Sequence, residues 1–151
     1  MRKKNTKDCM EFGHTCVVYN LRRTSRAITQ LYEEHLKPSG LLPTQFTLLA
    51  AVKVMGPVQM SKIADELILD RSTLTRNIRL LEKNGFLLIS PLKGDQRIRE
   101  INITSIGLNK LKEAVPYWQE AQNLITKMLT NTRVDRMLND LRETALATTK
   151  V

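Results

Sequence analysis

The sequence contains little of several residue types on which whole classes of protein depend. Its 151 residues include two cysteines, two histidines and one tryptophan, and aromatic residues make up 5% of the chain. Two cysteines, Cys9 and Cys16, cannot build a disulfide framework, so we expect them to be thiols in a reducing compartment. The low aromatic content argues against a surface on which single-stranded bases stack.

Long apolar segments and catalytic motifs are also missing. No hydrophobic run approaches the roughly 18 residues of a membrane span, and no apolar stretch follows the basic start of the chain as a signal peptide would require. We therefore expect a cytoplasmic protein with no membrane partner. The sequence has no glycine-rich phosphate loop and no nucleophile elbow, so it predicts neither an enzyme nor a cofactor.

Positive charge is what the chain has in excess. Its 24 Lys and Arg residues outnumber 15 Asp and Glu residues, which gives a net charge of +9 and favours an anionic partner. The excess is concentrated between residues 71 and 99, where the only acidic residues are Glu82 and Asp95. The length suits one domain, with or without helical extensions.

Hydrophobic periodicity predicts a mainly α-helical fold with a small β-hairpin. Pro116 should kink or break the helix that contains it, and residues 58–60 read as a short connection. The first helix and the last two helices have apolar stripes that a central module cannot cover alone. We therefore expect these helices to form a dimer interface. The alternative is a monomer in which they fold back on the core. The expected helices are 10–37, 44–54, 61–67, 71–84, 104–130 and 133–147, and the expected strands are 86–92 and 97–103.

The helix at 71–84 has two distinct faces. Asp70 is placed to cap it, and at 100° per residue Leu74, Ile78 and Leu81 fall on one narrow stripe. A row of hydrogen-bond donors without a carboxylate occupies the opposite pole: Ser72, Arg76, Arg79 and Lys83. Such a row on a helix fits the major groove of duplex DNA.

Two segments of the chain resemble the MarR family of bacterial transcription regulators. LDRSTLTRNIRLLEKNG at 69–85 resembles the recognition helix of that family, and GDQRIREINIT at 94–104 resembles its wing. The D-x-R of the wing and the L-E-x-x-G-F that ends the helix are fairly specific together. The usual wing has adjacent arginines after its aspartate, whereas here Gln96 replaces the first, which leaves Arg97 and Arg99 at the tip.

The resemblance implies a winged helix-turn-helix fold flanked by dimerisation helices. It predicts a homodimer in which each subunit binds half of a palindromic operator in double-stranded DNA. Family members usually repress nearby genes and leave DNA when a small phenolic ligand, another effector or an oxidant acts. The expected divisions are a tail and dimerisation helix at 1–42, a DNA-binding module at 43–104, and dimerisation helices at 105–151.

We assign DNA contacts to the row on the helix and to the basic hairpin. Arg97 is expected to enter the minor groove. A carboxylate is repelled by phosphates, so Asp95 is expected to orient the wing by holding an arginine, with Arg99 as the candidate. The complete set of expected DNA-contacting residues is Ser72, Thr73, Thr75, Arg76, Arg79, Lys83, Arg97 and Arg99.

Several alternatives to this interpretation stay open. Cys16, and Cys9 with it, would serve an oxidant-sensing regulator of the same fold, although in an intact helix the two lie too far apart for a mutual disulfide. A winged-helix module that binds protein or RNA is the alternative from another class. No metal site is expected, because His14 cannot share one helix face with both cysteines. The resemblance also implies a pocket for a small aromatic effector, but Trp118 and its aromatic neighbours are equally explained by core packing.

Overall fold

The computed structural model describes residues 13–92 and 94–149 of the chain. Its helical content and its small antiparallel sheet confirm the expected fold class. In chain order the elements are α2 (Val17–Leu36), the 3-10 helix η1 (Lys37–Ser39), α3 (Pro43–Met55), β1 (Val58–Gln59), α4 (Met60–Leu67), α5 (Arg71–Lys83), β2 (Leu87–Leu92), β3 (Asp95–Ile103), α6 (Ser105–Leu129) and α7 (Asn131–Thr148).

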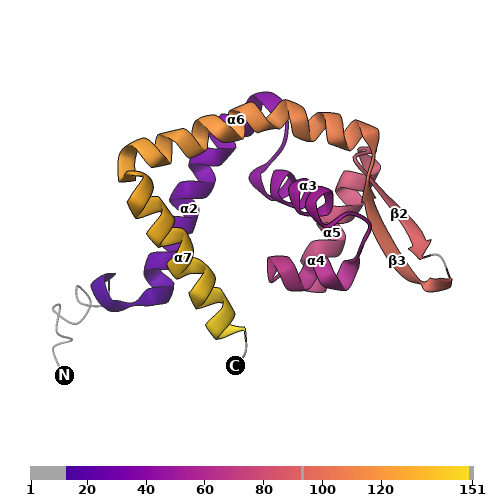
Figure 1. The fold of residues 1–151 in the computed structure, drawn as a ribbon, viewed down its shortest axis with the longest axis horizontal. Helices are drawn as coiled ribbons and strands as arrows, with labels where there is room; N and C mark the ends of the chain where they lie inside the picture. The colour runs from indigo at the N-terminus through magenta and orange to yellow at the C-terminus, as the bar shows by residue number, and fades with distance from the viewer. Residues whose placement is uncertain (1–12, 93, 150–151) are drawn as a thin grey trace, which may run out of the picture.

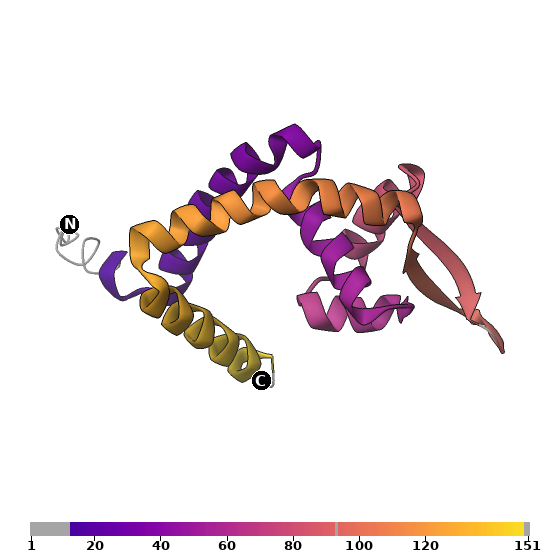
Figure 2. The same cartoon turned by 45° about the horizontal axis from the view of Figure 1, so that its top comes forward.

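Helix α6 spans the length of the molecule and connects its two ends. Figures 1 and 2 show α2 and α7 crossing at one end of α6, and α3, α4, α5 and the three-stranded sheet gathered at the other. The charged helix α5 and the hairpin therefore lie together, at the opposite end of α6 from its junction with α7.

The hydrophobic core lies at the end of the molecule that contains α5. It is formed by side chains of α3, α4, α5 and the sheet, closed by the first turns of α6 and the end of α2. The residues with no exposed surface include Leu36, Leu49, Val52, Ile63, Leu74, Ile78, Leu81 and Ile101.

The sheet has one strand more than the hairpin that the sequence predicts. Its order is β1-β3-β2, and both pairs are antiparallel. Residues 58–60, expected to be a plain connection, include β1, in which Val58 pairs with Ile101. This short strand attaches the base of the hairpin to the segment that leads into α4.

Helix α6 is continuous through Pro116, so of the expected kink or break the break is absent. A proline inside a helix removes one N–H and leaves the carbonyl of the residue four positions earlier, here Lys112, without its donor. Pro116 and Lys112 are both exposed. Water can therefore satisfy the freed carbonyl, and the helix continues for 25 residues.

The expected first helix at 10–37 is not continuous. Residues 13–15 are helical, but Cys16 has an extended backbone (φ −76°, ψ 111°), and α2 begins at Val17. Cys16 is therefore the residue before α2 and does not lie inside a helix. The prediction for Cys9 falls outside the described residues.

Helices α2 and α7 have apolar side chains that this single chain does not cover. Leu36 is the only buried residue of α2, and α7 has none. Val17, Leu21, Leu138 and Leu141 are each at least 37% exposed. This uncovered surface agrees with the expectation that these helices pack against a second copy of the chain.

The start of α6 is fastened to the end of α5 and the start of the hairpin. Thr104 caps α6 as predicted: its Oγ1 accepts from the N–H of Gly107 at 3.0 Å and donates to the carbonyl of Gly85 at 2.6 Å. A Cβ at Gly107 would lie only 2.0 Å from the carbonyl oxygen of Phe86. Only a glycine allows the two backbones to approach so closely.

Replacing Gly107 by alanine is therefore expected to destabilise the fold. In an ordinary helix position a Gly→Ala change stabilises by about 1 kcal/mol, but here the added methyl group would force the backbone of Phe86 aside. We expect a loss of about 1–3 kcal/mol or more in the free energy of unfolding, measured by urea denaturation. Asn109→Ala, on the exposed side of α6, is the matched control; a Gly107→Ala midpoint at or above that of the wild type would contradict the contact.

Candidate nucleic-acid interface

The first turn of α5 is organised by Asp70. Its carboxylate caps the helix as predicted, accepting from the N–H of Thr73 at 2.8 Å and from the hydroxyl of Ser72 at 2.5 Å. The Ser72 hydroxyl and, next, the Thr73 N–H hold the pKa of Asp70 well below its ordinary value. A carboxylate at the N-terminus of a helix also interacts favourably with the helix dipole.

The orientation of α5 follows from its apolar stripe. Leu74, Ile78 and Leu81 have no exposed surface, so the opposite face is turned to solvent. Of the α5 side chains assigned to DNA, four are exposed as expected, namely Ser72, Arg76, Arg79 and Lys83. Thr73 and Thr75 are half-buried.

A hollow of about 580 Å³ lies along the exposed face of α5. It brings together part of the expected row and one residue that sequence reasoning missed. The lining residues are Arg71, Ser72, Thr75, Arg76 and Arg79. On an ideal helical wheel Arg71 falls near the apolar stripe, but no earlier helical turn covers it, so its guanidinium is exposed. Its position as the first helical residue was the signal that could have identified it.

The hairpin presents the second basic surface. Arg97 and Arg99 are exposed on β3, and Gly94 makes the turn with φ +97°. The Asp95 carboxylate accepts from the backbone N–H of Arg97 at 2.9 Å. It was expected to hold the side chain of Arg99, but the only ion pair among the described residues joins Lys110 and Glu113. Asp95 therefore fixes the backbone at Arg97.

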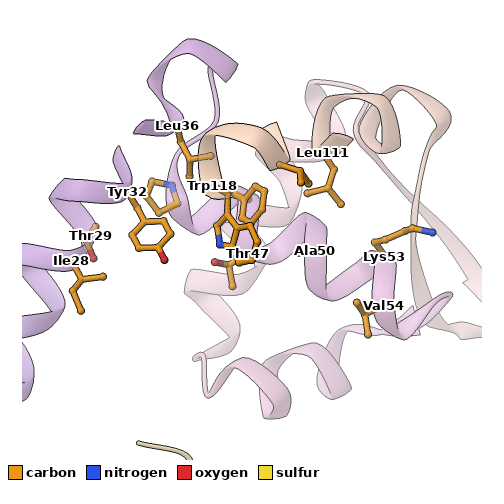
Figure 3. A pocket seen from close by; sticks show the side chains of 13 residues that line it. Ile28, Thr29, Tyr32, Leu36, Thr47, Ala50, Lys53, Val54, Leu111 and Trp118 are labelled. Atoms are coloured by element: carbon orange, nitrogen blue, oxygen red, sulfur yellow. The ribbon is translucent and has the colours of Figure 1, made fainter. Parts of the chain in front are cut away.

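A separate pocket of about 650 Å³ lies where α2, α3 and α6 meet (Figure 3). The rings of Phe46 and Trp118 are stacked, with centroids 5.9 Å apart. The hydroxyl of Tyr32 donates to the side-chain oxygen of Gln122, and burial raises the pKa of Tyr32. Lys53 is the one charged residue of the lining, which otherwise consists of Ile28, Thr29, Tyr32, Leu36, Pro43, Phe46, Thr47, Ala50, Val54, Leu111, Val115 and Trp118.

The remaining candidate residues do not form a site in the described part of the chain. Cys16 is half-buried before α2, and the oxidant-sensing hypothesis stays a prediction. Within residues 13–92 and 94–149, no group of three or more His, Cys, Asp and Glu side chains is arranged to hold a metal ion. No helix in that part of the chain is both long and apolar enough to cross a membrane.

Known proteins resemble the chain both in sequence and in structure. Residues 41–98 match the MarR family. YwoH of Bacillus subtilis, an uncharacterized HTH-type transcriptional regulator, is 24% identical over 62% of this chain and 77% of its own length. SarZ of Staphylococcus haemolyticus, an HTH-type transcriptional regulator, is 29% identical over 57% of this chain and 58% of its own length. The transcriptional regulator MosR of M. tuberculosis, solved in complex with DNA, superposes with a TM-score of 0.76 and 34% identity, covering 88% of this chain and 98% of MosR.

The lowered pKa of Asp70 predicts how acid affects α5. Because the folded-state pKa lies below the ordinary value of 3.8, the stabilisation by Asp70 is complete above that pH and is lost as the pH falls below it. We expect the urea midpoint of the wild type to exceed that of Asp70→Ala at pH 6, and the difference to shrink below about pH 4. Asp70→Asn is the control, since it retains an acceptor for the cap but has no titratable group. A difference between wild type and Asp70→Ala that stays constant down to pH 3 would contradict the lowered pKa of Asp70.

Proposed function

Since this chain belongs to the MarR family of transcriptional regulators, we propose that it is a homodimeric repressor that binds a palindromic operator in double-stranded DNA. The observation that carries this proposal is the exposed face of α5, where three arginines line one hollow. The buried stripe of the same helix keeps that face outward. We place the DNA-binding module at 43–104 and the dimerisation helices in the flanking segments, and a regulator of transcription would act in the cytoplasm.

Helix α5 would enter the major groove with its basic face toward the bases. Arg71, Arg76 and Arg79 can each form bonds to phosphate oxygens or to the N7 and O6 of guanine. Phosphate contacts supply much of the affinity and make it depend on salt, whereas base contacts supply the choice of sequence. Lys83, in the last turn of α5, is exposed but outside the hollow, and we assign it to phosphate.

The hairpin would place Arg97 in the minor groove beside the half-site. A narrow minor groove has a strongly negative potential that attracts a guanidinium. The bond between the Asp95 carboxylate and the N–H of Arg97 supports this role, because it fixes the backbone from which the arginine extends. Arg99 is exposed two residues along the same strand and is assigned to the flanking phosphates.

Removing the two central arginines should weaken operator binding. For Arg76→Ala and Arg79→Ala we expect a rise in Kd of roughly tenfold or more each, since a good base contact contributes about 1–3 kcal/mol. The measurement is a fluorescence-anisotropy titration with a palindromic duplex at several salt concentrations. Lys127→Ala, at the far end of α6, is the matched control for loss of one positive charge.

The same titration separates duplex recognition from the competing function. A protein that binds RNA through its winged helix would show equal or tighter binding to single-stranded RNA of the same length, whereas one that binds another protein would bind neither nucleic acid. Wild-type affinity for duplex DNA in both arginine variants would also contradict the proposal.

The pocket between α2, α3 and α6 is proposed as the site of a small aromatic effector. Its largely apolar lining and the stacked pair of Phe46 and Trp118 favour a flat apolar ring. Hydroxyl groups of Thr29, Tyr32 and Thr47 supply a few polar groups at the wall. Since the wall includes α3 of the proposed DNA-binding module and α2 of the proposed dimer interface, a ligand there contacts both.

Occupancy of this pocket can be followed through its tryptophan. Trp118 is the only tryptophan in the sequence, so a phenolic acid such as 4-hydroxybenzoate is expected to change its fluorescence on binding and to release the protein from duplex DNA. Ala50→Phe should fill the pocket, retain DNA binding and abolish release. If aromatic acids release Ala50→Phe as readily as the wild type, the effector acts elsewhere.

A further inference from the structure

The hydroxyl groups of Ser72 and Thr75, on the exposed side of α5, both donate hydrogen bonds to acceptors within α5 or at its N-cap. The hydroxyl of Ser72 donates to the Asp70 carboxylate at 2.5 Å, a bond strengthened by the negative charge of its acceptor. The hydroxyl of Thr75 donates to the backbone carbonyl of Arg71, one turn earlier, at 2.6 Å. A hydroxyl has one donor and two acceptor lone pairs. Toward any partner outside the helix, both oxygens are therefore acceptors only.

Both oxygens lie on the surface that is proposed to face DNA. Ser72 and Thr75 line the same hollow as Arg71, Arg76 and Arg79. The low pKa of Asp70 keeps its carboxylate ionised at the pH values at which proteins bind DNA, so the acceptor for the Ser72 proton persists there.

An acceptor cannot bond to a phosphate oxygen, which is itself an acceptor. The phosphate contacts of this face therefore fall to the arginines, and the two hydroxyl oxygens are left for base edges. In the major groove, adenine N6 and cytosine N4 are amino donors, whereas guanine and thymine present carbonyl acceptors. Each base pair thus has one base with an amino group in the major groove. A hydroxyl oxygen that can only accept a hydrogen bond distinguishes which strand carries that base.

We propose that Ser72 and Thr75 select the operator by the strand on which the amino group lies, favouring adenine or cytosine over guanine or thymine at two neighbouring positions of each half-site. This inference rests on the proposed binding of duplex DNA. The Cβ atoms of residues three apart on a helix are about 5–6 Å apart, and successive bases rise about 3.4 Å. The two positions therefore lie one or two base steps apart.

Asp70 has the role of a positioning residue in this selection. It acts through Ser72 by holding the hydroxyl proton away from the DNA. With no acceptor at position 70, the hydroxyl could rotate and donate to a carbonyl of guanine or thymine as readily as it accepts from an amino group. Discrimination at the Ser72 position would then disappear while that at the Thr75 position remained.

The test is selection of bound duplexes from a random pool, followed by Kd measurements on single-base variants of the selected sequence. The wild type is expected to enrich a palindrome in which adenine and cytosine are interchangeable at two neighbouring positions. Guanine or thymine at either position should raise Kd by roughly three- to tenfold, the range for one hydrogen bond. Ser72→Ala should remove the preference at one position, and Thr75→Val at the other.

Asp70→Gly tests the positioning role, because glycine is tolerated at helix N-caps. It should abolish the preference at the Ser72 position and leave that at the Thr75 position, which serves as the internal control. A uniform loss of affinity with both preferences intact would mean that Asp70 only caps the helix, which overturns its positioning role. Circular dichroism establishes that each variant is folded, and Ser72→Ala and Thr75→Val test the inference even if Asp70→Gly does not fold.

The failure of this inference differs from failure of the proposed function. If no duplex sequence is enriched, DNA recognition itself is overturned. If a palindrome is enriched but guanine or thymine is preferred at these positions, or both substitutions leave every preference unchanged, the acceptor role is overturned and duplex binding stands. Replacing the selected adenine by 2-aminopurine, which moves the amino group to the minor groove, should raise Kd because the donor for the hydroxyl oxygen is lost from the major groove.

Discussion

The burial of three side chains on one side of α5 determines what the rest of the molecule can do. Leu74, Ile78 and Leu81 are fully enclosed, and burying such side chains stabilises by about 1.5–3 kcal/mol each. Turning the helix by one residue would expose part of this stripe and bring a guanidinium toward an apolar core, where an unpaired charge is very unfavourable. The core thus holds the arginines in solvent, and the orientation of the proposed interface is maintained by side chains that are themselves buried.

The sequence predicted the parts of the fold that local signals specify. The caps at Asp70 and Thr104 and the stripe of α5 each depend on residues within a few positions of one another, and the structure confirms them. Strand β1 escaped prediction because two residues have no periodicity and become a strand only by pairing with β3. The continuity of α6 at Pro116 depends on solvent exposure, and the interruption at Cys16 concerns a single residue in an otherwise helical pattern.

In the candidate site, too, local sequence patterns predicted some features, and others depend on the three-dimensional structure. Residue types and helical spacing were enough to find the arginine row, but they could not say which way a hydroxyl proton points. Only the structure shows that the Ser72 hydroxyl donates to the Asp70 carboxylate and that the Thr75 hydroxyl donates to the carbonyl of Arg71. The proposed effector pocket is lined by residues of α2, α3 and α6 that lie up to about ninety positions apart in the chain, as are Tyr32 and Gln122, which share a hydrogen bond. No local pattern could have assembled it.

Helix α6 connects the proposed effector pocket to the hairpin of the proposed DNA interface. Its 25 residues correspond to a length of about 37 Å. Its first turn packs so closely against the backbone of Phe86, at the start of the hairpin, that a movement of α6 also moves the hairpin. A rotation of about 5° at the α2 end would sweep the hairpin through an arc of about 3 Å, close to the height of one base pair. In a dimer, the displacements of the two hairpins either add to or cancel each other in the distance between the two DNA-binding modules. A ligand that rotates α6 by this amount would put the two halves of the protein out of phase with the helical repeat of the duplex.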